Sequence, residues 1–265
     1  MNPDHHANAS PDRGPAVVAS TLPSAFGAHC ALFLDFDGTL VDLAERPQDV
    51  FAPYGLLDTL ERLRDLLDGA LAIVSGRPIE QIDHFLAPLK LAAAGVHGAE
   101  RRGADGAMTL ADVASLHAIE TAAQALVDAH PELLLERKRG SLALHYRAAP
   151  HLAEECTAAM RAAVAGSPGV VLLPGKMVLE AKPDSVGKGT AIAALLGEAP
   201  FAGRMPVFIG DDVTDEAGFE TVQAQGGVGV KVGLEATVAK HRLESPDAVR
   251  NALAQAAATL AAETK

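Results

Sequence analysis

Short apolar runs alternate with helical patterns along the chain from about residue 31. Continuous apolar runs predict strands that are buried on both faces, and leucines at helical spacing predict a helix. The elements expected here are a strand at 31–37, a helix at 55–69, a strand at 70–77, a helix from Pro78 and a strand with its loop at 91–100. This β-α-β-α-β order predicts a parallel sheet with helices on both faces.

The pattern changes over residues 101–183. Two segments, 132–147 and 170–183, predict β-hairpins because Arg-Gly-Ser and Pro-Gly-Lys turns separate their apolar runs. Ala-rich helical patterns lie beside them, near 112–130 and 150–165. This mixture differs from the preceding alternation, so we expect an inserted α+β domain.

The first pattern returns after the insertion. Its expected elements are a helix at 185–198, a strand at 206–212, a short strand at 226–233 and a helix over roughly 246–262. We therefore predict an α/β fold with a Rossmann-like parallel-sheet core. The expected boundaries are a flexible N-terminal tail at 1–27, a catalytic core formed by 28–101 and 184–265, and the inserted α+β domain at 102–183.

Composition excludes several classes of protein. No apolar stretch reaches the length of a membrane span, and the polar, Pro-rich start is unlike a secretory signal. The two cysteines lie far apart in sequence, which favours a reducing, cytoplasmic compartment over a disulfide framework. A net charge of −12 disfavours nucleic-acid binding. It does not exclude an anionic substrate, because a metal ion and a few cationic side chains can reverse the electrostatic field within one pocket.

Two carboxylates follow the first predicted strand, in LFLDFDGTL. Asp35 and Asp37 are two positions apart, so they tend to project to the same side where the strand ends. Ligands of open α/β sheets bind outside the carboxyl ends of the strands. Two such carboxylates can divide the chemistry, one as nucleophile and the other as acid and then base. The alternative is a helix N-cap or a turn aspartate.

A second acidic cluster follows a later apolar strand, in IGDDVTDE. Asp211, Asp212 and Asp215 are crowded, and like charges this close repel each other unless a cation lies among them. Hard oxygen ligands favour Mg²⁺. The alternative, strongest for Asp215 and Glu216, is an acidic helix N-terminus.

Two further positions suit a phosphate. Ser75 precedes Gly-Arg-Pro at the start of a predicted helix, where it is either an N-cap or a phosphate ligand. Lys188 also lies at a helix start, where the helix dipole disfavours a cation unless an anion is bound nearby. Gly189 follows the lysine, so the spacing of a nucleotide-binding P-loop is absent.

The order of these motifs resembles the haloacid dehalogenase superfamily of phosphotransferases, from about residue 30 to the end of the chain. The resemblance implies that Asp35 is the nucleophile, that Asp37 is the general acid and base, and that Ser75 and Lys188 hold the phosphoryl group. The Mg²⁺ ligands it implies are Asp35, the backbone carbonyl of Asp37, Asp211 and, through water or lysine contacts, Asp215.

Four segments narrow the resemblance to the trehalose-6-phosphate phosphatase family: GVHGAE, ERKRGSLALHYR, GKMVLEAKP and GDDVTDE. The resemblance implies Mg²⁺-dependent hydrolysis of trehalose 6-phosphate through an aspartyl-phosphate, and it makes the inserted domain a cap that recognises the sugar. The resemblance also implies substrate-binding residues, some of them in the seam between the core and the cap. Together these are Gly76, Arg77, His97, Gly98, Glu100, Glu136, Lys138, His145, Arg147, Lys176 and Glu180.

The roles of the cap residues can also be interpreted without the family resemblance. Lys176 and Glu180 are four apart across a predicted turn, so they could bind sugar hydroxyls or form a surface ion pair. His145 and Arg147 are expected to share one face of a strand, with Tyr146 on the other.

We expect a monomer that binds a small-molecule sugar phosphate and neither nucleic acid nor membrane. One alternative is the same chemistry on another sugar phosphate, such as sucrose phosphate. Another is a receiver-type signalling module. Such a module also places acidic residues and a lysine around Mg²⁺, but it binds phosphate without catalytic turnover. The second aspartate of the first motif and the inserted domain weigh against that class.

Overall fold

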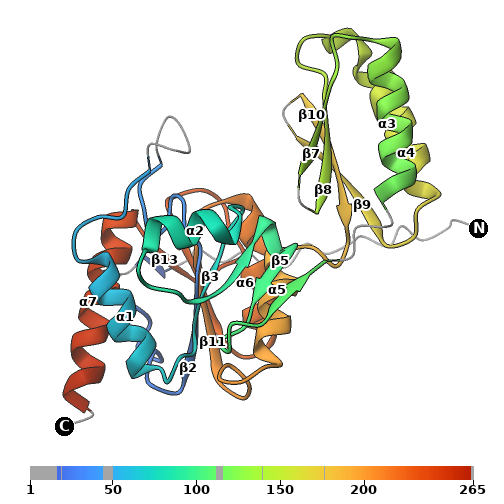
Figure 1. Ribbon diagram of the computed structural model, residues 1–265. Helices are drawn as coiled ribbons and strands as arrows, with labels where there is room; N and C mark the ends of the chain where they lie inside the picture. The colour runs from blue at the N-terminus through green and yellow to red at the C-terminus, as the bar shows by residue number, and fades with distance from the viewer. Residues whose placement is uncertain are drawn as a thin grey trace, which may run out of the picture.

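The computed structural model describes residues 17–18, 20–43, 50–111, 116–138, 140–175 and 177–263, with the backbone alone described at 17, 18 and 138. Figure 1 shows a large core and a smaller domain built on a second sheet. Within the described ranges, no helix combines the length and the apolar character that a membrane span requires.

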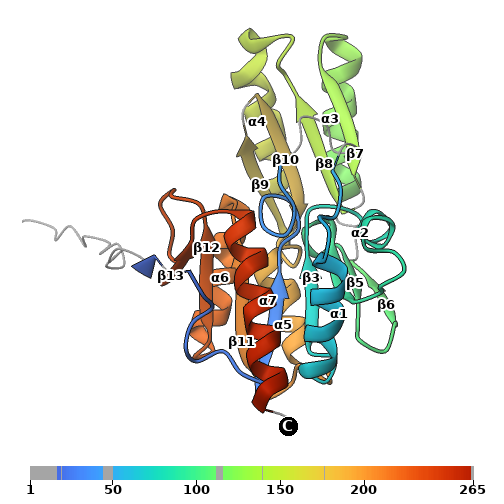
Figure 2. The same cartoon turned by 90° about the vertical axis from the view of Figure 1, so that its left-hand side faces the viewer.

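The core is built on a nine-stranded sheet in the order β1-β13-β12-β11-β2-β3-β4-β5-β6. Pairing is parallel from β1 to β4 and antiparallel from β4 to β6. In chain order the strands are β1 Val17–Val18, β2 Cys30–Leu34, β3 Leu71–Val74, β4 Ala92–Gly95, β5 Glu100–Arg102, β6 Met108–Leu110, β11 Met205–Gly210, β12 Val228–Val232 and β13 His241–Leu243. The carboxyl ends of the parallel strands point toward the smaller domain (Figure 2).

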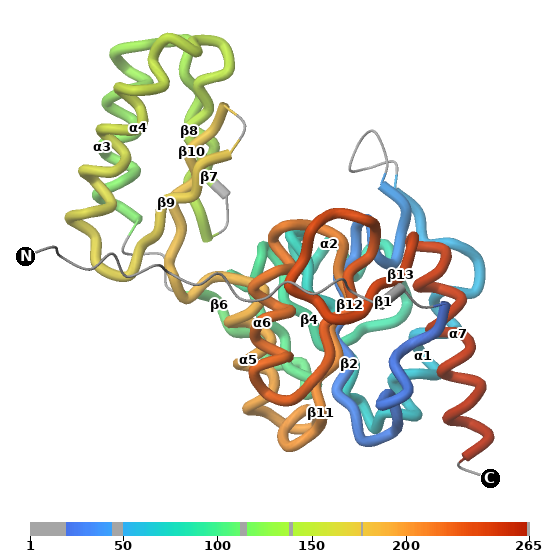
Figure 3. Tube along the Cα trace, turned by 180° about the vertical axis from the view of Figure 1, so that it is seen from behind, coloured from blue at the N-terminus to red at the C-terminus, as the bar shows by residue number. Residues whose placement is uncertain are grey.

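Helices cover both faces of this sheet, which confirms the predicted α/β core. Helices α1 and α7 pack against each other on the side away from the smaller domain, and α5 packs against α6 on the side nearest it (Figures 1 and 3). The core helices are α1 Leu56–Leu66, α2 Ile79–Leu86, α5 Lys188–Leu196, α6 Glu216–Ala224 and α7 Pro246–Glu263.

Strand β2 lies at the centre of the sheet, between β11 and β3, and every residue in it is buried. This explains why its sequence is continuously apolar rather than alternating. Aromatic contacts extend the core around it: Phe33 stacks on Phe201 with ring centroids 5.4 Å apart, and Phe208, its neighbour in β11, lies 5.3 Å from Phe219. Because the strand is fixed along its length, the residues that follow it begin from a rigid point.

The smaller domain is a four-stranded antiparallel sheet in the order β7-β8-β10-β9, with two helices on one face. Its elements are α3 His117–Ala129, β7 Leu134–Lys138, β8 Ser141–His145, α4 Ala153–Ala165, β9 Val170–Gly175 and β10 Val178–Pro183. Both predicted hairpins and both predicted helices are present. Alternate residues such as Leu135, Leu144 and Leu179 face α3 and α4 and form a second apolar core. The opposite face of the sheet carries no helix within the described residues.

The domain boundaries differ from the sequence prediction in two places. Strands β5 and β6 belong to the nine-stranded sheet, so the change of domain falls after Leu110 rather than at residue 102. Part of the predicted tail packs on the core: β1 pairs with β13, and Leu22 is buried. Residues 1–16 and 19 of that tail lie outside the described residues. Segments this short carry no measurable periodicity, which is why the sequence did not predict them as strands.

Candidate active site

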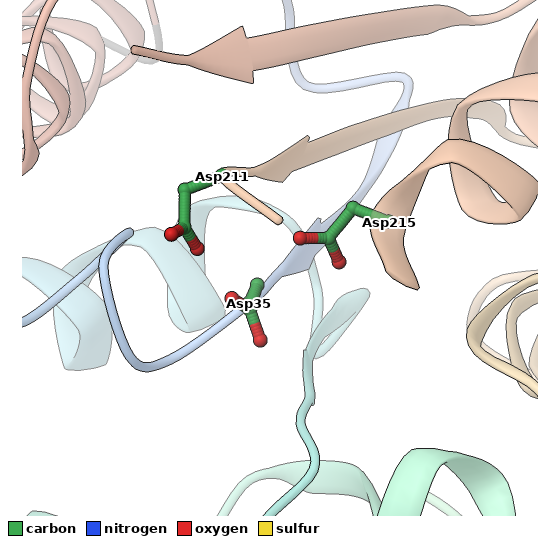
Figure 4. Close-up of side chains that lie close together, drawn as sticks. All are labelled: Asp35, Asp211 and Asp215. Carbon is green, nitrogen blue, oxygen red and sulfur yellow. The ribbon is translucent and has the colours of Figure 1, made fainter. Parts of the chain in front are cut away.

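The predicted catalytic residues meet at the carboxyl edge of the core sheet. Asp35 follows β2, Ser75 follows β3 and Asp211 follows β11, and these three strands are neighbours. Because the carboxyl ends of parallel strands share one edge, residues distant in sequence lie close together. Figure 4 shows the carboxylates of Asp35, Asp211 and Asp215 directed toward a common centre.

These three aspartates form a compact acidic cluster. One carboxylate oxygen from each lies within 4.8 Å of the others. The Lys188 ammonium, at the start of α5, donates to Asp35 Oδ1 at 2.8 Å and to Asp215 Oδ1 at 2.6 Å. Asp35, Asp215 and Lys188 are buried. Lys188 thus contacts two of the three carboxylates, which leaves a local excess of negative charge.

Burial dominates the proton affinities in the cluster. It raises the pKa of Asp35 to about 6, although Lys188 opposes the shift, and it raises the pKa of Asp215 to about 7 with a further contribution from Asp35. Burial also raises the pKa of Asp211. For Lys188, burial alone lowers the pKa, but Asp35 and Asp215 outweigh it and hold the pKa above its usual value. A divalent cation would relieve the same excess of charge.

The turn after β2 positions two of these carboxylates. The buried Thr39 hydroxyl donates to Asp211 Oδ1 at 3.2 Å and lies 3.4 Å from Asp35 Oδ2. Gly38 has a φ of +74°, and a Cβ there would lie 2.2 Å from Asp211 Oδ2. Only glycine fits this position without displacing the carboxylate of Asp211. The sequence did not predict that Thr39 bridges two aspartates, because Asp211 lies 172 positions away from it.

Asp37 has a different environment from Asp35, and its carboxylate is not part of the acidic cluster. Both of its oxygens accept hydrogen bonds from Arg77, at 2.6 Å from Nε and 2.7 Å from Nη2. Strand β2 ends at Leu34, so both aspartates lie beyond the regular strand and are not held on one face of it. The predicted metal role of Asp37 concerns its backbone carbonyl and stays a prediction.

Ser75 is buried, and its hydroxyl accepts the N–H of Arg77 at 3.1 Å. It does not cap α2, since no side chain caps that helix at its N-cap residue, Pro78. The Ile79 N–H at the helix start instead donates to Glu100 Oε2 at 3.0 Å. Glu100, predicted to bind substrate, therefore has a structural contact beneath the Ser75 turn.

Close packing brings the predicted glycines and His97 to the same turn. A Cβ on Gly76 would lie 2.7 Å from the His97 ring. Gly98 has a φ of +106°, and a Cβ there would lie 2.8 Å from the carbonyl of Gly187, at the N-terminus of α5. His97 itself is held in the left-handed region, with a φ of +55°. The segment 97–98 therefore lies between the Ser75 turn and the helix that carries Lys188.

Three predicted cap residues lie on the helix-free face of the smaller sheet. Glu136 and Glu180 flank Ala143 in register, and the Glu136 carboxylate contacts the His145 ring at 2.9 Å. The buried Ser141 hydroxyl donates to Glu180 Oε1 at 2.6 Å. Ser141 was not predicted to contribute to the site. Its contact depends on the pairing of β8 with β10, which no local sequence signal reveals.

The remaining cap predictions have different outcomes. Strand β8 ends at His145, so Arg147 lies in an exposed turn. The prediction that Arg147 shares a sheet face with His145 is therefore wrong. Tyr146 packs on the apolar core of the cap domain, as expected. Lys176 and the side chain of Lys138 lie outside the described residues.

One buried cation near the cluster was also missed. Lys231, in the apolar strand β12, is 2% exposed, and its ammonium donates to the backbone carbonyl of Asp211. A charged residue inside an apolar strand was the available signal, because lysine is rarely buried without a specific partner.

The Rossmann-like sheet with an inserted cap is the fold of the phosphatases of the haloacid dehalogenase superfamily. A superfamily phosphatase from Bacteroides thetaiotaomicron has the same fold, with a TM-score of 0.63 at 15% identity over 90% of this chain and 99% of that chain. Residues 33–248 match the family model for trehalose-phosphatase, and the chain belongs to that family of phosphoric monoester hydrolases.

Relatives at higher identity agree with this assignment. The chain is 41% identical over 218 residues to the trehalose-6-phosphate phosphatase of Escherichia coli, which covers 82% of each chain. The structure of Aspergillus fumigatus trehalose-6-phosphate phosphatase superposes with a TM-score of 0.71 at 27% identity, covering 86% of this chain and 92% of that one.

Proposed function

We propose that the chain hydrolyses trehalose 6-phosphate to trehalose and phosphate. The observation that carries the proposal is the acidic edge, where Asp35 lies between Lys188 and Asp211 at the end of the central strand. Membership of the trehalose-phosphatase family and the 41% identity to the Escherichia coli enzyme support the choice of substrate.

In the proposed mechanism, a carboxylate oxygen of Asp35 attacks phosphorus in line and forms an aspartyl-phosphate. Asp37 gives a proton to the departing sugar oxygen, then takes one from the water that hydrolyses the intermediate. The Ser75 hydroxyl and the Lys188 ammonium bind the phosphoryl oxygens. Lys188 already contacts Asp35 at 2.8 Å. The same ammonium can therefore stabilise negative charge first on the carboxylate and then on the phosphoryl oxygens.

The residues of the cluster fit Mg²⁺. Their donors are hard carboxylate oxygens, and the buried ammonium groups of Lys188 and Lys231 leave three carboxylates incompletely neutralised. Asp35, Asp211 and the carbonyl of Asp37 would hold the ion, with Asp215 supporting it through Lys188 or water. When bound, Mg²⁺ would offset charge on the phosphoryl oxygens.

The helix-free face of the cap sheet is the proposed site of sugar recognition. Glu136, His145 and Glu180 lie together on it, and Lys138, Lys176 and Arg147 are further candidates. Closure of the cap onto the carboxyl edge would bring the sugar against the seam formed by Gly76, Arg77, His97, Gly98 and Glu100 and exclude water. A cytoplasmic location and a monomeric state remain predictions.

The nucleophile is tested by Asp35→Asn, assayed for phosphate release from trehalose 6-phosphate with Mg²⁺. We expect kcat to fall roughly 1,000-fold or more, because the amide is a far weaker nucleophile. Asp42→Asn is a matched control in the same segment, since Asp42 is 65% exposed and pairs with Arg250. Appreciable activity in Asp35→Asn would exclude this assignment.

A substrate panel tests the sugar. Trehalose 6-phosphate, sucrose phosphate, glucose 6-phosphate and p-nitrophenyl phosphate should be compared under multiple turnover, with Mg²⁺ and with EDTA. We expect the highest kcat/KM for trehalose 6-phosphate. Preference for another sugar phosphate would retain the chemistry and reject the substrate, and phosphate binding without turnover would indicate a receiver-type module.

A further inference from the structure

The guanidinium of Arg77 is fixed on several sides. Besides the two bonds to Asp37, Nη1 donates to Gln81 Oε1 at 3.3 Å. The guanidinium carbon lies 4.9 Å from the ring centroid of Phe85 and 5.9 Å from that of Phe36. Gln81 and Phe85 both belong to α2, so this helix determines where the guanidinium points.

The contact with Asp37 is bidentate, which fixes orientation as well as distance. Two parallel N–H donors match the two oxygens of a carboxylate and restrict its rotation. Within the described residues, the hydrogen bonds to the Asp37 carboxylate come from Arg77. The Asp37 side chain is 28% exposed, so packing alone does not restrict it.

Asp35 has no comparable need for Arg77. Lys188 and Thr39 contact its carboxylate, and the side chain is almost completely buried. The two carboxylates of the motif are thus oriented by separate cations, Lys188 from α5 and Arg77 from the turn before α2.

We propose that Arg77 is a positioning residue that orients the carboxyl group of Asp37 for proton transfer to the leaving sugar oxygen. This inference rests on the proposed function and replaces the sequence-based assignment of Arg77 to substrate binding. A small misplacement of a proton donor costs rate because transfer requires hydrogen-bond distance to the reacting oxygen. Arg77 acts through Asp37 and needs no contact with the substrate.

The dependence of kcat/KM on the leaving group tests this role. A sugar alkoxide must be protonated as it departs, whereas p-nitrophenolate is a stable leaving group that needs little help from an acid. We expect Arg77→Met to lower kcat/KM roughly 100-fold on trehalose 6-phosphate and less than about 10-fold on p-nitrophenyl phosphate. Arg77→Lys, which retains a cation without the planar fork, should recover part of the loss.

Arg64→Met is the matched control, since Arg64 pairs with Asp65 and Glu61 on the exposed side of α1. It should leave both kcat/KM values unchanged. Thermal unfolding of each variant identifies misfolding, which would reduce activity on both substrates alike. Equal losses on the two substrates in a folded Arg77→Met would overturn the proposal in favour of phosphate binding.

A double-mutant cycle provides the second test. If Arg77 acts through Asp37, Arg77→Met should cause little further loss on trehalose 6-phosphate in an Asp37→Asn background. Fully additive losses would exclude a shared role. Failure of the proposed function itself looks different, because the unmodified chain would then release no phosphate from trehalose 6-phosphate.

Discussion

One buried hydroxyl illustrates how a single residue can determine recognition on the cap. Ser141 is 4% exposed and donates to Glu180 Oε1 at 2.6 Å across the β8–β10 pair. A charge-assisted hydrogen bond of this kind restricts the rotation of the carboxylate. Glu180 therefore presents a defined acceptor on the helix-free face, where the sugar is proposed to bind.

Glu180→Ala tests the role of that carboxylate. We expect kcat/KM on trehalose 6-phosphate to fall roughly 100-fold, while the loss on p-nitrophenyl phosphate stays below about 10-fold, because the aryl group has no hydroxyls for it to bind. Ser141→Ala should have a smaller effect of the same selectivity, near 3- to 10-fold. Glu154→Ala, on the exposed side of α4, is the control. Equal losses on both substrates would mean that Glu180 does not bind the sugar.

Gly38→Ala tests the packing around Asp211. Alanine would combine the strain of a positive φ, about 1 kcal/mol, with a contact that displaces Asp211. We expect Mg²⁺ affinity, measured by calorimetry without substrate, to fall at least 10-fold, an estimate from the loss of one ligand. Gly106→Ala separates the two effects, because Gly106 has a φ of +83° and a Cβ there would meet nothing within 4 Å. Unchanged Mg²⁺ binding in Gly38→Ala would contradict the proposed ligand set.

At the scale of elements, the strongly periodic segments were predictable and the short ones were not. The continuous run of β2 and the leucine spacing of α1 each correspond to an element within two or three residues of the expected bounds. Strands β6 and β13 have three residues each and take their structure from their neighbours in the sheet. Helix α6 was not among the expected elements, although an acidic helix N-terminus was the alternative interpretation of Asp215 and Glu216, where it begins.

The acidic edge was predictable because it follows from one rule, that polar residues after neighbouring parallel strands converge. That rule places Asp35, Ser75 and Asp211 together without knowledge of the loops. The contacts that orient these residues depend instead on tertiary structure. Arg77 lies 40 positions from Asp37, and Ser141 lies 39 from Glu180, so only the docking of α2 and the pairing of β8 with β10 bring each pair together.

Asp215 shows that an acidic residue can belong to a cation-binding cluster and to a helix N-terminus at the same time. Its Oδ2 accepts the N–H of Asp212 at 2.9 Å in a capping box at the short 3₁₀ helix Val213–Asp215. Its Oδ1 accepts the Lys188 ammonium at 2.6 Å. The carboxylate thus begins a helix and also belongs to the acidic cluster, so a helix-start motif is not evidence against a metal site.

At the scale of the whole molecule, the acidic cluster should make stability depend on pH, in a protein that already carries a net charge of −12. Asp35 and Asp215 have pKa values raised to about 6 and about 7, above the usual value of 3.8. In that range the folded chain binds protons that the unfolded chain does not. The stabilisation from these groups is therefore complete below pH 3.8 and is lost as the pH rises through 6 and 7. Lys188 stays protonated throughout this window and does not change the sign.

The metal-free protein should therefore lose free energy of unfolding between pH 5 and pH 7.5, by an amount on the order of 1–3 kcal/mol. At the proposed site Mg²⁺ would bind the deprotonated carboxylates of the folded state, so it should restore stability at pH 7.5 and have little effect at pH 5. Urea unfolding at both pH values, with EDTA or with Mg²⁺, measures this. Asp215→Asn should flatten the pH dependence in EDTA, whereas Asp212→Asn, at an exposed neighbour, should retain it. A metal-free protein that is more stable at pH 7.5, with the same slope in Asp215→Asn, would show that the cluster does not control its stability.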